Sequence, residues 1–408
     1  MLNWAQRFST FCFLDNHQYR FGHHTQECLL AAGVKDRSPE NTSFTGLQNF
    51  VDGKKNTWLF GHLSYDLVID HERVPAILVD NIGFPGFFFF EPMHLISLNE
   101  TQLTIDSAAP AETFEEINKI TLDDTFFENP ENVIIENRIQ KEEYVAIVDK
   151  LKEHILRGDC YEINFCQEFF ASPVLIDPAR VYDKLSDISP NPFSALYRFE
   201  DKWLICASPE RFLKKQGSKI LSQPIKGTSK RVLHSDSDDD KSKRELYLSS
   251  KDRSENVMIV DLVRNDLSKV CKEGAVYVDE LFGVYSFPQV HQMISTVSGI
   301  LKDDISFSEI ISATFPMGSM TGAPKKRVLE LIEQYEQTKR GIFSGAVGYI
   351  SPNGDFDFNV VIRSIMYNSY SRYLSFLTGS GITFYSDPEK EWEECLLKAA
   401  AIRMVLQS

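Results

Sequence analysis

The sequence predicts an α+β fold in which β-sheets are wrapped by helices. Long helical patterns follow runs of strand patterns along the chain, without regular β-α alternation. Apolar residues make up 43% of the 408 residues and charged residues 25%, as in folded globular proteins. A chain of this length can bury a large core, and its size alone is compatible with two or three domains.

Charge and hydropathy exclude several classes of partner. The net charge is −15, and phosphate binding needs a basic stripe that the sequence lacks, so we expect no nucleic-acid partner. Residues 1–14 lack a basic region followed by a long apolar run, and no stretch is long enough to cross a bilayer. We therefore expect no membrane partner and a cytoplasmic location.

Seven cysteines are scattered along the chain without a metal-binding spacing, so we expect reduced and mostly buried thiols. None lies in a glycine-flanked turn of the kind that presents a nucleophile. The sequence therefore predicts that this chain does not hydrolyse glutamine.

The N-terminal part, residues 1–125, has the pattern of short strands and turns. The apolar run 87–90 is typical of a core strand, and residues 25–32 predict a helical patch. From residue 113 to residue 127 the charge rises and the pattern weakens, which predicts a connector.

Helical patterns dominate the middle of the chain. Residues 141–157 carry apolar side chains at the spacing of a core-facing helix, and Gly158 ends it. Residues 235–245 are dense in charge and contain no large apolar residue, so we expect a solvated loop. Residues 244–270 predict one long helix.

Residues 316–324 predict a glycine-rich turn that leads into a helix over 325–337. Beyond that helix the strand signal dominates, and the Asn353-Gly354 step is a strong β-hairpin signal. Strands are expected at 345–351, at 356–365 and, broken at 379–381, at 373–385, and Asp387-Pro388 begins a final helix.

Two helices carry acids where a pocket could use them. Glu391, Glu394 and Lys398 lie within one ~60° arc at the edge of the apolar side of the final helix. This arc is either part of a pocket or an ordinary solvated face. Asp252 and Glu255 lie on the same face of the long helix as its apolar residues. Acids in that place need a counter-charge, which is either a basic side chain or a Mg²⁺ completed by waters and substrate oxygens.

Basic residues and glycine-rich turns provide candidate anion contacts. Arg363 belongs to the outward-facing set of a strand, where it could clamp a substrate carboxylate or form a cross-strand salt bridge. The turns 318–322 and 379–381 offer backbone N–H groups to an anion. Lys226 lies in the rigid element 224–228, and burial would favour the neutral amine that a nucleophile needs. Most lysines in turns are instead solvated.

Six segments in order over residues 140–405 resemble the chorismate-utilising enzyme family. They are residues 208–211, 224–228, 255–270, 318–325, 345–349 and 386–398, with a looser match at 61–67. The family includes anthranilate synthase component I, aminodeoxychorismate synthase component I, and the isochorismate and salicylate synthases. The resemblance implies two intertwined α+β halves with facing β-sheets and helices on the outside. Residues 1–125 would be the N-terminal β-rich part and residues 140–408 the chorismate-binding catalytic region of one compact structural unit.

The resemblance also implies site residues. Glu255 and Glu394 match residues that bind Mg²⁺ directly. Asp252 and Glu391 match residues that contact those ligands or reach the ion through a water molecule. The positions that match contacts to the carboxylates and ring substituents of chorismate are Thr228, Ser319, Tyr349, Arg363, Gly381 and Lys398. The family often has a histidine where this chain has Gln292.

Two positions bear on which member of the family the chain resembles. The lysine at 226 is typical of aminodeoxychorismate synthases, whereas anthranilate synthases usually have alanine there. Lys226 would then be the nucleophile and Glu210 the acid that protonates the departing hydroxyl. Isochorismate and salicylate synthases carry a water-activating lysine where this chain has Glu162.

The resemblance thus implies conversion of chorismate and ammonia to 4-amino-4-deoxychorismate on the route to p-aminobenzoate and folate. Ammonia would come from a separate glutamine amidotransferase subunit. The alternatives are an anthranilate synthase component I, an isochorismate or salicylate synthase, and a non-catalytic chorismate-binding subunit.

Overall fold

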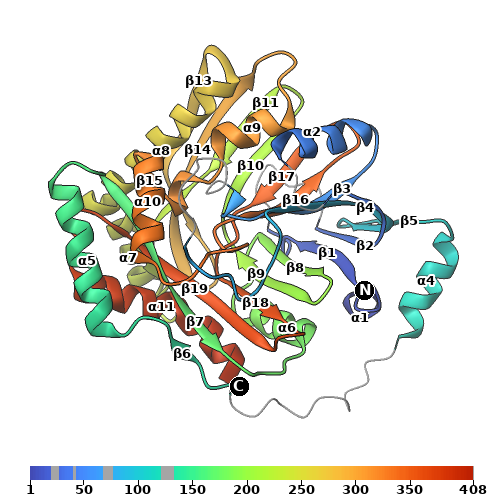
Figure 1. Ribbon diagram of the computed structural model, residues 1–408, viewed down its shortest axis with the longest axis horizontal. Helices are drawn as coiled ribbons and strands as arrows, with labels where there is room; N and C mark the ends of the chain where they lie inside the picture. The colour runs from blue at the N-terminus through green and yellow to red at the C-terminus, as the bar shows by residue number, and fades with distance from the viewer. Residues whose placement is uncertain (20–26, 40–42, 68–76, 121–132, 408) are drawn as a thin grey trace.

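The computed structural model describes residues 1–19, 27–39, 43–67, 77–120 and 133–407. The architecture is α+β, as the sequence predicts: strands run through the middle of the molecule and helices lie around them (Figure 1). Within these residues, no helix combines the length and the apolar character that a membrane span requires.

The N-terminal part is antiparallel sheet with short helices. Its strands are β1 (Thr10–Asp15), β2 (Cys28–Arg37), β3 (Leu59–Leu63), β4 (Phe87–Leu98) and β5 (Leu103–Asp106), and its helices are α1 (Leu2–Ala5), α2 (Phe44–Gly53) and α4 (Pro110–Lys119). β2 lies between β1 and β4, and β4 also pairs with β3 and β5. The predicted core strand at 87–90 is confirmed, because all four phenylalanines are buried in β4.

Two N-terminal predictions are wrong. The expected helix at 25–32 is strand β2 from Cys28 onward, where a continuous buried apolar run fits a strand with neighbours on both sides as well as it fits a helix. Residues 25 and 26 lie outside the described residues. The expected connector begins inside α4, whose Trp4–Glu116 hydrogen bond of 3.0 Å attaches it to α1. The rest of the expected connector, from residue 121, also lies outside the described residues.

Within the described residues, the middle of the chain contains runs of strands and four helices of 11 to 21 residues. Its elements are β6 (Glu136–Asn137), α5 (Lys141–Leu156), β7 (Glu162–Ala171), α6 (Pro178–Ile188), β8 (Phe193–Phe199), β9 (Lys202–Ser208), β10 (Arg211–Gln216), β11 (Lys219–Gln223), β12 (Ile225–Lys230), α7 (Asp236–Leu248), α8 (Ser250–Val270), β13 (Cys271–Ser286) and β14 (Val290–Leu301). The predicted helix at 141–157 is confirmed, with Tyr144, Ile147, Val148 and Leu151 buried.

The predicted loop at 235–245 is instead helix α7. Ser235 caps its N-terminus by accepting a hydrogen bond from the Asp238 backbone N–H, and acidic residues in the first turn complement the helix dipole. The single helix expected over 244–270 is divided at Ser249, whose side chain caps α8 by accepting from the Asp252 backbone N–H. The charged stretch is therefore a helix exposed to solvent.

The C-terminal elements are α9 (Phe307–Thr314), the 3-10 turn η1 (Gly318–Met320), β15 (Gly322–Ala323), α10 (Lys325–Tyr335), β16 (Ala346–Ile350), β17 (Phe356–Asn359), β18 (Ser364–Asn368), β19 (Tyr373–Ile382) and α11 (Pro388–Gln407). The predicted helices at 325–337 and after Asp387 are confirmed. The strand expected over 356–365 is interrupted after Asn359, and β19 runs through the glycines that were expected to break it.

Strands from distant parts of the chain are hydrogen-bonded to one another. β3 pairs with β16, β1 with β8, and β9 with β18, all antiparallel. β7 lies between β15 and β19 along the part that begins at Glu162. The N-terminal and C-terminal strands are thus intertwined in one network (Figure 1).

Two large clusters of buried side chains form the core, and α11 contributes to both. Trp392 and Cys395 belong to one cluster, and Ile402 and Leu406 belong to the other. The first turns of α11 therefore lie against the cluster that also contains residues of β7 and α8, which brings their acidic side chains into the same region.

Candidate active site

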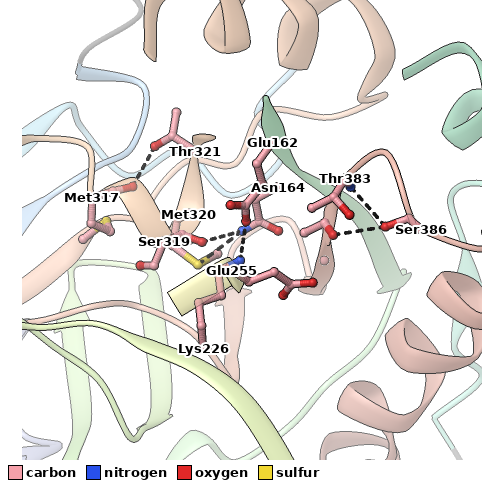
Figure 2. Close-up of polar contacts among 12 residues, drawn as sticks. Glu162, Asn164, Lys226, Glu255, Met317, Ser319, Met320, Thr321, Thr383 and Ser386 are labelled. Atoms are coloured by element: carbon pink, nitrogen blue, oxygen red, sulfur yellow. Dashed lines mark hydrogen bonds and ion pairs between the residues drawn. The ribbon is translucent and has the colours of Figure 1, made fainter. Parts of the chain in front are cut away.

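Lys226 and Glu162 form a buried ion pair. Lys226 Nζ on β12 lies 2.7 Å from Glu162 Oε1 at the start of β7, and the two side chains are 12% and 2% exposed. Figure 2 shows the two side chains pointing toward one another, with the Glu255 carboxylate to one side. Burial acts to lower the pKa of Lys226, but the nearby carboxylates outweigh burial and hold the pKa above its usual value. The amine is therefore protonated in this state, contrary to the expectation that burial makes it neutral.

Gly381 on β19 provides the space for this pair. A Cβ at this position would lie 2.8 Å from Lys226 Nζ and 2.8 Å from Glu162 Oε1, closer than real Cβ contacts allow. β19 holds Gly381 opposite Asn164 of β7. The glycine predicted to contact substrate thus has a steric role at the ion pair.

Glu210 lies buried beside this pair, in the bend between β9 and β10. Ser319 Oγ donates a hydrogen bond of 2.7 Å to Glu210 Oε1. Burial raises the pKa of Glu210 to about 7, against the opposing effects of the Ser319 hydrogen bond and the charge of Lys226. A carboxyl group with such a pKa carries a proton near neutral pH and can donate it.

Arg363 lies between β17 and β18 rather than within a strand. Its φ of 50° is in the left-handed region, which breaks the alternation that predicted an outward position. Burial lowers the pKa of its guanidinium to about 10, while the charge of Glu210 opposes that effect. Arg363 is therefore a cation near Glu210, where it can bind an anionic ligand.

The predicted metal-binding acids share one electrostatic environment. Lys251 Nζ lies 3.9 Å from Glu255 Oε1 on the same helix and 3.8 Å from Glu391 Oε1 at the start of α11. Burial acts to lower the pKa of Lys251, but Glu255, Glu391, Glu394 and Asp252 outweigh it and raise the pKa. A lysine thus supplies part of the counter-charge that the four acids need.

Glu255 is the acid whose surroundings best fit a cation. Burial raises its pKa to about 7, and its buried Oε1 has no hydrogen-bond partner among the described residues. In the described part of the chain, no three His, Cys, Asp or Glu side chains converge closely enough to hold a metal by themselves. The unpartnered Glu255 oxygen fits Mg²⁺, which proteins commonly bind through one or two carboxylates with waters and substrate oxygens as the remaining ligands.

Two further predicted substrate contacts are Lys398, on the same helix as Glu394, and Thr228, on the same strand as Lys226. Lys398 Nζ is 2.7 Å from Glu394 Oε1 and donates a 2.7 Å hydrogen bond to the Gly379 carbonyl, so it lies beside the acids. Thr228 is an exposed residue of β12, two positions after Lys226 and opposite Gln292 of β14.

Tyr349 is the predicted contact that the structure does not bring to the cluster. Its ring packs against Trp58 and Phe60, with ring centroids 5.4 Å and 6.0 Å away. It lines a separate cavity together with Phe193 and Asp357. Position 349 was matched by motif alone, and in the described residues its side chain belongs to this second cavity.

Sequence reasoning missed two residues of the site. Lys251 precedes Glu255 by one helical turn, and that i, i+4 spacing was a usable signal for their proximity. The pairing of Glu162 with Lys226 joins residues on strands far apart in the sequence, and no local pattern indicates it.

Known proteins resemble this chain in sequence and in fold. A family model described as chorismate binding enzyme matches residues 9–404. Aminodeoxychorismate synthase component 1 of Escherichia coli is 32% identical over 391 residues, which cover 94% of this chain and 82% of that protein. An anthranilate synthase component I-like protein of Synechocystis is 32% identical over 360 residues, which cover 86% of this chain and 72% of that protein.

Other relatives are longer than this chain. The chloroplastic aminodeoxychorismate synthase of Arabidopsis thaliana is 40% identical over 264 residues, which cover 64% of this chain and 28% of that protein. Among solved structures, anthranilate synthase component I from Streptococcus pneumoniae superposes with a TM-score of 0.82 at 22% identity, covering 95% of each chain. The isochorismate synthase MenF from Escherichia coli superposes with a TM-score of 0.80 at 16% identity, covering 100% of this chain and 91% of that one. These two structures share the fold.

Proposed function

The chain belongs to the chorismate-binding enzymes, and from that premise we propose that it is component I of an aminodeoxychorismate synthase. It would convert chorismate and ammonia to 4-amino-4-deoxychorismate, the precursor of p-aminobenzoate and folate. The observation that carries the proposal is the buried Lys226 amine, held among carboxylates close to the proton-bearing Glu210. A lysine in such a position supports amine chemistry at the substrate ring.

The protein's own residues divide the reaction into two displacements. The neutral amine of Lys226 forms a bond to C2 of chorismate, the ring double bonds shift, and the C4–O bond breaks as Glu210 gives its proton to the departing hydroxyl. Ammonia then forms a bond to C4, the double bonds shift back, and the C2–N bond to Lys226 breaks. A covalent intermediate and acid assistance replace one difficult step with two easier ones.

Charged side chains around the reacting atoms would orient the substrate. Arg363 and Lys398 are the cations suited to the carboxylates of chorismate. Mg²⁺ held by Glu255 and Glu394, with Glu391 and Asp252 nearby, would supply further positive charge for a substrate carboxylate.

We propose that ammonia comes from a separate glutamine amidotransferase subunit. All seven cysteines are buried, and burial raises the pKa of the Cys160 and Cys271 thiols to about 11, which suppresses the reactive thiolate. The word "component" in the relatives' names supports a partner subunit.

Anthranilate synthesis is the second candidate. Relatives described as anthranilate synthases match at 32% and 36% identity, close to the values for aminodeoxychorismate synthases. The two activities differ in product, because anthranilate synthesis also releases pyruvate.

A single incubation distinguishes these candidates. The purified protein is mixed with chorismate, Mg²⁺ and an ammonium salt, and the product is identified by mass. We expect the mass of aminodeoxychorismate without anthranilate, and we expect Lys226→Ala to lower the rate by about 100-fold or more. Anthranilate as the product, or ordinary rates in Lys226→Ala, would contradict the proposal.

A further inference from the structure

The two carboxylate oxygens of Glu162 have different surroundings. Oε1 accepts the 2.7 Å hydrogen bond from Lys226 Nζ. Oε2 is buried and has no hydrogen-bond partner among the described residues. An unpaired buried acceptor destabilises the folded protein, so its retention calls for an explanation in function.

The main chain fixes the position of Glu162. It lies on β7, with Ala323 of β15 opposite it, while the next residue, Ile163, faces Ile382 of β19. The side chain is 2% exposed, and Gly381 leaves room for its contact with Lys226 and for no additional side-chain atom. The carboxylate is therefore held at the reacting nitrogen (Figure 2).

The side-chain donor to the Glu162 carboxylate is Lys226. Hydrogen bonds to an ionised carboxylate stabilise its charge. Glu162 accepts a side-chain hydrogen bond at one oxygen, from Lys226, and its second oxygen gains no such stabilisation in the described structure. The donor that stabilises its negative charge is thus the group whose proton it would receive.

We propose that Glu162 is the proton acceptor that converts Lys226 into a nucleophile. This inference rests on the proposed function, in which the Lys226 amine attacks C2. The proton moves from Nζ to Oε1 along the existing hydrogen bond, so an ammonium–carboxylate pair becomes an amine and a carboxylic acid. The net charge of the pair is zero before and after the transfer, and no proton has to cross to solvent.

The proton balance closes over the complete cycle. Attack leaves a secondary ammonium on Lys226, and Glu162 stays protonated. Glu210 loses its proton to the hydroxyl that departs as water and regains one from the incoming ammonium ion, which becomes ammonia. When the C2–N bond breaks, Lys226 leaves as a neutral amine and recovers its proton from Glu162.

Other acids that face Lys226 are less suited to this step. Glu255 and Glu394 influence its charge, but Glu255 lies near Lys251 and Glu394 is paired with Lys398. Glu210 must keep its own proton for the leaving hydroxyl. In the described residues, Glu162 is the carboxylate within ion-pair distance of Lys226.

The test is the rate at which Lys226 becomes covalently modified when ammonia is withheld. Intact-protein mass spectrometry follows the gain of chorismate minus water after mixing with chorismate and Mg²⁺, from pH 7 to pH 9. We expect the wild-type rate to fall above about pH 7, because Glu210 then loses the proton that the departing hydroxyl needs. We expect Glu162→Gln to react at least tenfold more slowly than the wild type at pH 7, and its rate relative to the wild type to rise with pH as the amine loses its proton to solvent.

A counter-ion role for Glu162 predicts the opposite result. Removing a neighbouring negative charge lowers the pKa of Lys226, so a mere counter-ion would leave the Glu162→Gln rate at pH 7 unchanged or faster. That result would overturn the inference. Glu162→Asp keeps a base at a greater distance, and we expect a slower rate whose ratio to the wild-type rate does not change with pH, whereas a ratio that climbs with pH would also overturn the inference.

Two further measurements separate the possible failures. Glu91→Gln removes a buried glutamate that is paired with Lys35 and Lys54 far from this site, and it should form the adduct at the wild-type rate. If the wild-type protein forms no adduct and releases anthranilate once an ammonium salt is added, the proposed function itself fails. If the wild-type adduct forms on Lys226 and Glu162→Gln matches its rate and pH profile, only the role of Glu162 fails.

Discussion

Ser319 on the 3-10 turn η1 donates a 2.7 Å hydrogen bond to Glu210, a residue 109 positions earlier in the chain. The contact joins the glycine-rich turn at 318–322 to the bend between β9 and β10. It opposes the effect of burial on Glu210, because a hydrogen bond to the carboxylate favours its ionised form. One hydroxyl therefore adjusts how readily the proposed acid gives up its proton.

The first prediction concerns the pH dependence of turnover. Because the pKa of Glu210 is about 7 and its protonated form is the acid, kcat/KM should fall as the pH rises above about 7. Ser319→Ala removes the hydrogen bond that favours the carboxylate, so the alkaline limb should move to higher pH. Steady-state rates over pH 6 to 9 check this, and a limb that stays in place or moves to lower pH would contradict it.

The second prediction concerns stability at the same residue. The pKa of Glu210 is about 7 in the folded protein and about 4.5 in the unfolded chain. Its contribution to the free energy of unfolding is therefore full below pH 4.5 and is lost as the pH rises to about 7. The loss amounts to about 3 kcal/mol at 1.36 kcal/mol per pKa unit. Glu210→Gln lacks this titration, so its stability relative to the wild type should increase with pH. Urea unfolding at pH 5.5 and pH 7.5 measures the free energy of unfolding of both proteins. The same difference between wild type and Glu210→Gln at the two pH values would contradict the prediction.

The third prediction concerns the space around the ion pair. Gly381→Ala places a methyl group against the flexible ends of Lys226 and Glu162, so the pair must move although the backbone need not. We expect the free energy of unfolding to change by less than about 1 kcal/mol and turnover to fall at least tenfold. Gly53→Ala, where a Cβ meets no atom within 4 Å, is the matched control and should keep full activity. Normal turnover in a folded Gly381→Ala protein would refute the steric role.

The fourth prediction concerns Mg²⁺. Lys251 lies 3.9 Å from Glu255 and 3.8 Å from Glu391, where its charge competes with a metal ion. Lys251→Met should therefore lower the Mg²⁺ concentration for half-maximal activity about threefold to tenfold at low salt. Lys241→Met, which removes an exposed lysine paired with Glu245 on α7, should leave that concentration unchanged. A chelator should abolish turnover in each protein. If Lys251→Met needs the same Mg²⁺ concentration as the wild type, Lys251 does not compete with the metal ion.

The fifth prediction concerns the buried support beneath the site. Arg340 is 1% exposed, pairs with Glu336, and donates to the carbonyls of Met320 and Asn164 at 2.6 Å and 2.7 Å. Arg340→Gln leaves a buried carboxylate and two carbonyls without their donor, which should cost about 3–5 kcal/mol. Arg327→Gln, in a partly exposed i, i+3 pair on α10, should cost no more than about 1 kcal/mol. Denaturant unfolding compares the two, and similar losses would show that Arg340 does not support the site.

Helices with regular apolar spacing could be predicted from the sequence, whereas several other elements could not. The patterns at 141–157 and after Asp387 correspond to α5 and α11. The run from Cys28 to Ala32 is apolar at every position, and such a run has no period that separates a strand from a helix. In α7 the acidic first turn and the Ser235 cap were usable signals, but the lack of large apolar residues concealed them.

The candidate site was predictable where helix geometry governs it. The spacing of Asp252, Glu255, Glu391 and Glu394 singled out acids that the fold places around Lys251. The pairing of Lys226 with Glu162 depends on which strands lie side by side, which no local pattern specifies. Arg363 was placed by assuming a regular strand, and its left-handed backbone departs from that assumption. Tyr349 was matched by its motif alone, and its side chain lines a second cavity.

The pairing of β3 with β16 has a consequence for how the protein is made. The ribosome completes residues 59–63 long before residues 346–350 exist, so β3 lacks one of its two neighbours during most of synthesis. Unpaired strand edges are prone to aggregation, and contacts between distant residues slow folding. We therefore expect residues 1–125 and 140–408 to complete their folding only after residues 346–350 have been synthesised, and overproduction to depend strongly on chaperones that shield the nascent chain.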